Sequence, residues 1–160
     1  MNKSKLALLV LALSVMFFGG CSTVPLEPKE MSESAKSFNT PPKGKAGLYV
    51  YRDSLVGQAL KKDIWIDKKC LGETSNAIFF HKNVEGDKKH NLSTESEFSA
   101  NNLSIETKSG KNYYVRQYIK MGVFVGGAGL EVVEEDEAQK AISKLDMAKK
   151  GICSKKYPAE

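Results

Sequence analysis

Three glutamates are the residues of this chain whose type and spacing come closest to catalytic chemistry. Glu95 and Glu97 stand two positions apart in a segment with strand-like alternation, and Glu106 follows in the next such segment. Alternate residues of a strand share one face at about 6 to 7 Å, and paired carboxylates at such separations can hydrolyse glycosidic bonds. Acidic side chains on strand faces are more commonly just solvated, and no recognisable glycosidase motif surrounds these three. We therefore expect a protein that is not an enzyme, with glycan hydrolysis through Glu95 or Glu97 as the alternative.

The two histidines and the glycine-rich segment give no support for a bound cofactor. His81 and Glu85 have the i, i+4 spacing of a helical metal motif, but their segment is typical of strand and loop. His90 follows two lysines, whose charges would repel a cation. The glycines between positions 122 and 129 lack the Gly-Lys-Ser/Thr ending of a phosphate-binding loop. We expect neither a metal nor another cofactor.

Aromatic residues and both arginines of the chain gather on predicted strands. Such surfaces are over-represented at binding sites, and flat rings also suit the faces of sugars. Alternation places Tyr114, Arg116 and Tyr118 on one strand face. The candidate binding surface comprises Tyr49, Tyr51, Arg52, Trp65, Tyr114, Arg116 and Tyr118. The alternative is a packing face, with a C-terminal helix laid over the tyrosines.

The N-terminus has the features of an export signal. Lys3 and Lys5 precede a short apolar run that ends in two glycines and Cys21. The run of about 15 residues is shorter than the ~20 that span a bilayer, although an uncleaved signal anchor is the competing interpretation. Residues 18–21, Phe-Gly-Gly-Cys, resemble the bacterial lipobox. The resemblance implies a signal peptide over residues 1–20 and a diacylated Cys21, and two acyl chains anchor a protein stably.

Location and charge limit the partners. Ser22, rather than Asp, follows Cys21, which resembles the Gram-negative sorting pattern for the outer membrane and implies its periplasmic face. Loss of Lys3 and Lys5 with the signal reduces the formal net charge from +5 to +3. We expect the basic residues to form a solvated surface; the alternative is that they contact anionic lipid headgroups. We expect no nucleic acid, because an exported chain leaves the cytoplasm. The expected partners are the membrane, through the Cys21 anchor, and an envelope protein or peptidoglycan.

Cysteine usage agrees with an oxidising compartment. Of the three cysteines, Cys70 and Cys153 remain once Cys21 is lipidated, and such a pair favours one disulfide. Two separate buried thiols are the alternative. Neither cysteine lies in a Cys-x-x-Cys pair or a recognised nucleophile motif, so we do not expect a catalytic thiol.

Composition divides the chain after the signal into two parts. Residues 21–45 hold four of the five prolines with many Ser, Glu and Lys residues, which predicts a flexible tether that holds the domain off the membrane. Residues 46–153 alternate as short strands, and Ser109-Gly110-Lys111 indicates a hairpin. Helical spacing and charge placement predict one helix over about 134–150, before a tail at 154–160. We expect a mainly β fold, a small antiparallel β-sandwich of the Ig/PEGA-like type with one C-terminal helix.

Two resemblances extend this interpretation. Residues 64–74 and 84–92 resemble PEGA-type surface modules, small β-sandwiches used as envelope spacers and binding units, although Val-Glu-Gly-Asp stands where such modules have Pro-Glu-Gly-Ala. Residues 46–140 more closely resemble a family of small bacterial lipoproteins known as domain of unknown function 2846. The segments that carry this second resemblance are 47–52, 110–115 and 126–130. This second resemblance implies a fold and a location, and it does not indicate which activity, if any, the protein has.

Overall fold

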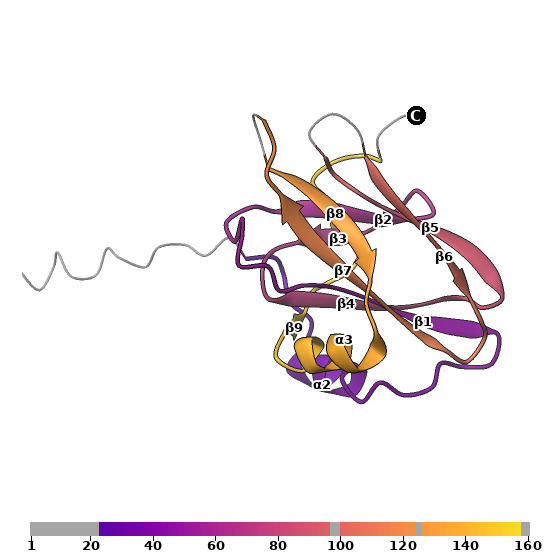
Figure 1. The fold of residues 1–160 in the computed structure, drawn as a ribbon. Helices are drawn as coiled ribbons and strands as arrows, with labels where there is room; N and C mark the ends of the chain where they lie inside the picture. Colours follow the sequence, from indigo (N-terminus) through magenta and orange to yellow (C-terminus); the bar gives the residue numbers. More distant parts are fainter. Residues whose placement is uncertain (1–22, 97–99, 124–125, 158–160) are drawn as a thin grey trace, which may run out of the picture.

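Two β-sheets pack face to face in the computed structural model, which describes residues 23–96, 100–123 and 126–157 (Figure 1). The mainly β sandwich with a C-terminal helix is therefore confirmed. Its elements in chain order are α2 (Lys29–Ala35), β1 (Lys45–Arg52), β2 (Lys62–Ile66), β3 (Lys69–Thr74), β4 (Ile78–Glu85), β5 (Lys88–Thr94), β6 (Asn101–Thr107), β7 (Asn112–Lys120), β8 (Gly127–Val132), α3 (Glu135–Ile142) and β9 (Asp146–Met147).

The two sheets differ in how their strands are joined. The four-stranded sheet has the order β3-β2-β5-β6 and is antiparallel throughout. The five-stranded sheet has the order β8-β7-β1-β4-β9, in which β1 pairs with β7 and β4 pairs with β9 in parallel. Its central strand β1 thus lies between one antiparallel and one parallel neighbour, which come from distant parts of the sequence.

The main core fills the space between the sheets. Leu48 and Val50 of β1 point inward, as do Ile64 and Ile66 of β2, because side chains two positions apart share a face. The intervening tyrosines of β1, Tyr49 and Tyr51, point to the other face and are buried as well. A strand that is buried on both faces needs a second covering layer, and the helices supply it.

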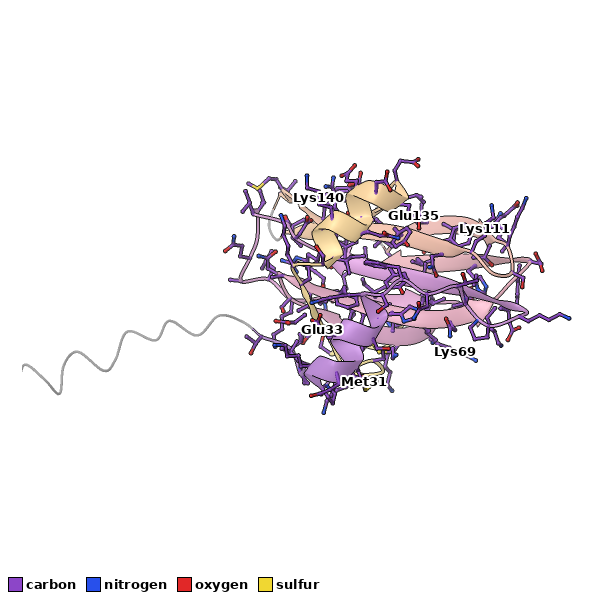
Figure 2. The ribbon with its side chains drawn as sticks, turned by 90° about the horizontal axis from the view of Figure 1, so that it is seen from below. Met31, Glu33, Lys69, Lys111, Glu135 and Lys140 are labelled. Carbon is purple, nitrogen blue, oxygen red and sulfur yellow. A yellow bond between two sulfur atoms is a disulfide. The ribbon has the colours of Figure 1, made fainter. Side chains whose placement is uncertain are left out.

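The helices α2 and α3 cover the outer face of the five-stranded sheet (Figure 2). A second apolar cluster lies beneath them, formed by residues from the sheet, α2 and α3: Ala35, Tyr49, Tyr51, Phe79, Tyr114, Ala138, Ile142, Leu145 and Met147. Burial of this cluster explains why the sequence maintains apolar side chains on both faces of β1.

The segment that precedes β1 corrects the predicted tether. Residues 24–42 are folded onto the sheet: Val24 joins the main core, Ala35 packs in the second cluster, and Pro41 is buried. Leu26 also forms a β-bridge to Ala148. The composition predicted flexibility because apolar residues are few, but these few residues are the ones that pack. The N–H of Glu27 also donates a hydrogen bond to the carbonyl of Met147 in β9 at 2.8 Å.

The predicted hairpin around Gly110 is wrong. β6 pairs with β5 in one sheet, whereas β7 pairs with β1 and β8 in the other. The tight connection therefore crosses between the sheets. Gly110 has φ +78°, and its N–H donates to the carbonyl of Lys45 at 2.8 Å, so the turn is anchored to β1 rather than to its own flanking strand.

The C-terminal helix is shorter than the predicted span 134–150. α3 ends at Ile142, and the chain then turns so that Asp146 and Met147 pair with the start of β4. Leu145 and Ala148 fit helical spacing in the sequence, but the structure buries them, with Met147, at the sheet edge instead. Pairing with an open strand edge satisfies backbone groups that a longer helix would leave at the edge of β4.

The predicted signal peptide, residues 1–20, and the predicted lipidation residue Cys21 lie outside the described residues. Among the residues that the structure does describe, no helix has the length and apolar character needed to cross a bilayer.

Candidate functional site

Three aromatic rings lie side by side across the outer face of the five-stranded sheet. Tyr49 of β1 is in register with His81 of β4 on one side and with Tyr114 of β7 on the other. Its ring stacks on His81 at 4.3 Å between centroids with an interplanar angle of 12°, and on Tyr114 at 5.3 Å with 23°. The Tyr49 hydroxyl donates to the carbonyl of Ala35 at 2.9 Å, which ties this row to α2. Cross-strand aromatic pairs of this kind stabilise a sheet face.

A pocket of about 460 Å³ opens at the His81 end of this row. Its floor includes Tyr49 and His81, and its walls come from α2, the 39–42 segment and the chain after β9. Polar side chains line the rim: Glu30, Ser34, Asn39, Thr40, Asn83 and Lys150. The pocket thus combines flat rings below with hydrogen-bonding groups above, which is the composition of many ligand sites.

His81 is neutral near pH 7. Burial, assisted by the positive charge of Lys150, lowers the pKa of its imidazole to about 4. The ammonium of Lys150 also donates to the backbone carbonyl of His81 at 2.9 Å. The neutral ring keeps one nitrogen able to accept a hydrogen bond, and the lysine is the cation at this rim.

This shift predicts a pH dependence of folding. The folded-state pKa of His81 lies below its value of 6.5 in the unfolded chain, so the unfolded chain binds more protons between pH 6.5 and 4. The folded state therefore has its full stability with respect to His81 above pH 6.5, where the ring is neutral in both states. The free energy of unfolding falls as the pH decreases from 6.5 to 4. Because the ring is partly exposed, we expect a loss of about 1 to 3 kcal/mol rather than the full shift. Urea unfolding at pH 7 and pH 4.5 measures it. His81→Phe keeps the stacked ring, and an equal acid loss in that variant would contradict the assignment.

The structure divides the predicted binding surface. Tyr49, Tyr51 and Tyr114 lie in the second cluster under the helices, so they form a packing face, which was the alternative. The Tyr114 hydroxyl accepts a hydrogen bond from Gln139 of α3 at 2.8 Å. Burial raises the pKa of Tyr51 to about 12.

Both arginines have structural partners. Arg52 is fully buried, and its guanidinium donates to the carbonyls of Leu60 and Gly57 in the loop after β1. Burial lowers the pKa of Arg52 to about 10. Arg116 is half-exposed and forms an ion pair with Glu131 at 2.6 Å. Only Arg116 and Tyr118 of the predicted surface therefore stay accessible.

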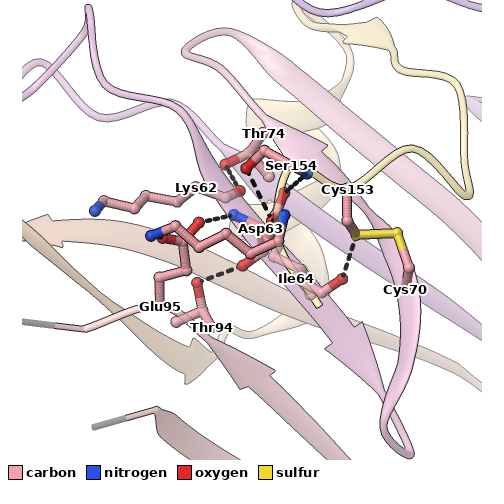
Figure 3. The surroundings of a disulfide bond; sticks show 10 residues. Lys62, Asp63, Ile64, Cys70, Thr74, Thr94, Glu95, Cys153 and Ser154 are labelled. Atoms are coloured by element: carbon pink, nitrogen blue, oxygen red, sulfur yellow. Dashed lines mark hydrogen bonds and ion pairs between the residues drawn. A yellow bond between two sulfur atoms is a disulfide. The ribbon is translucent and has the colours of Figure 1, made fainter. Parts of the chain in front are cut away.

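Trp65 is buried on the opposite side of the molecule, beneath the C-terminal tail. Its ring meets that of Tyr157 edge to face at 5.7 Å. The tail is tied to the four-stranded sheet by a disulfide between Cys70 and Cys153 (Figure 3). The residues predicted as a tail at 154–160 thus include a segment that covers the sheet.

Two carboxylates lie next to this disulfide. Asp63 is fully buried and accepts hydrogen bonds from the tail: from the N–H of Ser154 at 3.1 Å, from its hydroxyl at 3.0 Å and from the N–H of Lys155 at 2.7 Å (Figure 3). Glu95 accepts from the N–H of Asp63 at 2.8 Å and forms an ion pair with the ammonium of Lys155. Burial raises the pKa of Asp63, while the bonds from the tail oppose this shift.

These contacts give Glu95 a structural role, because both of its oxygens are engaged and its side chain is nearly inaccessible. Glu106 is exposed on β6, and Glu97 lies outside the described residues. His90 is also structural: its ring bonds the carboxylate of Asp67 at 2.7 Å. Within the described part of the chain, no three His, Cys, Asp or Glu side chains come together as metal ligands.

Sequence reasoning missed the pocket and a polar tie between the sheets. The amide of Gln117 in β7 bonds Thr74 of β3 and Thr94 of β5, and all three residues are fully buried. The available signal was Gln117 standing between Val115 and Ile119, where alternation points to the core. The pocket carried no such signal, because its helical wall lies in a segment whose composition favoured a tether.

The geometry defines a two-sheet β-sandwich with a helix-covered outer face and a small aromatic-floored pocket. The chain belongs to the family described as "Protein of unknown function (DUF2846)", which matches residues 42–128. It is also 55% identical over 133 residues to an "Uncharacterized protein" of Haemophilus influenzae (strain Rd), an alignment covering 83% of this chain and 79% of that protein. The family resemblance seen in the sequence is therefore confirmed, whereas the PEGA-like type stays a prediction.

Proposed function

We propose that this protein is a membrane-anchored envelope lipoprotein that binds an envelope ligand without transforming it. The lipobox-like residues before Cys21 support the anchor, and the disulfide between Cys70 and Cys153 fits an oxidising compartment. Both agree with a site at the periplasmic face of the outer membrane. The candidate ligands are a wall glycan and another envelope protein.

The pocket favours the glycan. The single observation that carries this choice is the stacked pair of His81 and Tyr49 beneath a polar rim. The half-buried ring of His81, supported by the buried Tyr49 ring, can contact the C–H face of a sugar, while the carboxylate of Glu30 and the amide of Asn83 can bond its hydroxyl groups. Lys150 adds a cation for the acidic substituents of peptidoglycan. The volume of about 460 Å³ lies within the range of roughly 300–1,000 Å³ found for small-ligand sites.

Removal of two rim groups tests this function. We expect the Glu30→Ala/Asn83→Ala variant to bind purified peptidoglycan about 10-fold more weakly, since each lost hydrogen bond is worth about 0.5–1.5 kcal/mol. Both residues are exposed, so the fold should be retained. Glu106→Ala, an exposed carboxylate on the other sheet, is the matched control. Co-sedimentation with peptidoglycan measures the affinity.

The other outcomes separate the alternatives. Equal binding by the variant and the control would remove the pocket as the glycan site. Release of soluble fragments from labelled peptidoglycan would support an enzyme instead. Capture of one envelope protein that is lost with the Glu30→Ala/Asn83→Ala variant would favour the protein ligand, and no ligand of either kind would leave a passive spacer.

The anchor has its own prediction. We expect Cys21→Ala to accumulate as an unprocessed precursor that retains residues 1–20, because a lipobox cysteine must be acylated before cleavage. Mass spectrometry of the membrane fraction measures the N-terminus. A normally cleaved Cys21→Ala chain would show that ordinary signal cleavage operates and that lipidation does not.

A further inference from the structure

Exposed apolar side chains gather on two loops of the sandwich. The loop after β1 presents Leu55, which is 86% exposed, together with Val56 and Leu60. The segment after β7 presents Met121 at 89% and Val123 at 76% exposure. Single exposed apolar residues are ordinary on a protein surface, but a group of this kind marks a contact with a partner or a membrane.

The two loops belong to one end of the molecule. Gly57 lies against Ile119 at the end of β7, and a Cβ at this position would approach that side chain to 2.8 Å. Gly126 follows the second loop, and a Cβ at this position would approach Leu60 of the first loop to 2.6 Å. The buried guanidinium of Arg52 holds the first loop through the carbonyls of Leu60 and Gly57. The backbone that displays Leu55 and Val56 is therefore held in place by Arg52.

The described chain begins at the same end. Arg52 is in register with Ile78, Ile78 pairs with Asp146 of β9, and Leu26 bridges to Ala148 just after β9. The first residues of the folded part therefore flank the strand ends where the loop after β1 starts (Figure 1). Val24 is already in the core.

The length of chain before Val24 limits how far the domain can stand from an anchor. Three residue steps separate Cys21 from Val24, and three extended residues span at most about 11 Å. A lipid on Cys21 thus holds this end of the domain at the headgroup layer. The predicted tether would have allowed free rotation above the membrane, whereas the folded segment does not.

We propose that the loops after β1 and β7 form a docking surface for a phospholipid bilayer, into which Leu55, Met121 and Val123 insert. Lys62 and Lys120 flank these loops and complement anionic headgroups, whereas the neighbouring Lys61 pairs with Glu73 at 3.5 Å. The inference rests on the proposed anchor at Cys21. An acyl anchor combined with apolar and basic side chains holds a protein in one orientation, which points the pocket in a defined direction.

Site-specific fluorescence tests the docking surface independently of natural lipidation. The chain starting at Cys21 is coupled through that thiol to a maleimide lipid in phosphatidylethanolamine/phosphatidylglycerol vesicles with brominated acyl chains. Cys21 is the reactive thiol, because the other two cysteines form the disulfide. Leu55→Trp is the reporter. Val132→Trp is the matched control, since Val132 is 56% exposed at the opposite end of β8, in register with Val115. The native Trp65 is buried and supplies a constant background.

We expect the Leu55→Trp emission to shift to the blue and to lose most of its added intensity, while the Val132→Trp emission stays unchanged. Adding Met121→Asp and Val123→Asp to the reporter should restore the emission. Absence of quenching at position 55, or equal quenching at both positions, would overturn the docking surface. Failure of the wild-type precursor to become acylated in cells would instead refute the anchor, so the two failures are distinguishable.

Discussion

Replacing both Cys70 and Cys153 with serine should lower the free energy of unfolding by about 4 kcal/mol. The two cysteines are separated by 83 positions. In the chain-entropy model, a cross-link that closes a loop of this length restricts the unfolded chain by about 4.5 kcal/mol. A domain of this size has a total stability of only about 5–15 kcal/mol, so much of it depends on one bond.

The same change should loosen the C-terminal tail. Without the cross-link, Ser154 and Lys155 can leave the sheet. The buried carboxylate of Asp63 would then lose its hydrogen bonds from the tail, and Glu95 would lose its ion pair with Lys155. Guanidinium unfolding with and without reductant measures the effect, and reduced wild type should match the double variant. Ser154→Ala is the control, because it removes a single hydroxyl bond to Asp63 and should cost about 1 kcal/mol. An unfolding midpoint that reduction does not change would contradict the assigned role.

The Tyr49→Ala substitution should cost about 3–5 kcal/mol, the range for truncating a fully buried aromatic side chain. Tyr49 stands at the centre of the row of rings, in contact with His81, Tyr114 and Phe38. Its removal leaves a cavity beneath α2 and deprives His81 of its stacking partner. Thermal unfolding and the near-ultraviolet circular dichroism of the aromatic rings measure the loss.

Tyr49→Phe is the matched control for this prediction. It keeps the ring and removes the hydroxyl that bonds the carbonyl of Ala35, so we expect a loss of about 1 kcal/mol and an intact pocket floor. A small effect of Tyr49→Ala, similar to that of Tyr49→Phe, would mean that α2 is not docked on this sheet.

Strand positions were predictable where alternation and turn residues agree. Leu48 and Val50 alternate with Tyr49 and Tyr51 in β1, and Gly86 and Asp87 form the turn that separates β4 from β5. Which strands pair was less accessible. The sequence predicted a hairpin of β6 and β7 because only four residues connect them. The pairing of β7 with β1 involves residues far apart in the sequence, so local spacing could not predict it.

Short segments with few apolar residues were the other difficulty. Val24, Ala35 and Pro41 are too sparse to produce a periodic signal, so the composition of residues 21–45 favoured a tether. The pocket depends on this segment and on Lys150, which lies more than 100 positions away. A site formed by such distant residues has no local motif, whereas the cysteine pair was predictable because counting alone indicated it.

The bridge between Leu26 and Ala148 also sets the order of folding events. These residues are 122 positions apart, and β1 must likewise wait for β7, which begins at Asn112. Contacts between distant residues slow folding, because loop-closure entropy is lost before any pairing is gained. A chain that emerges from its N-terminus first therefore cannot complete this sheet edge until almost the last residue has appeared. During that interval the segment around Leu26 has no strand to pair with, so the first folded residues of the chain are among the last to be fixed.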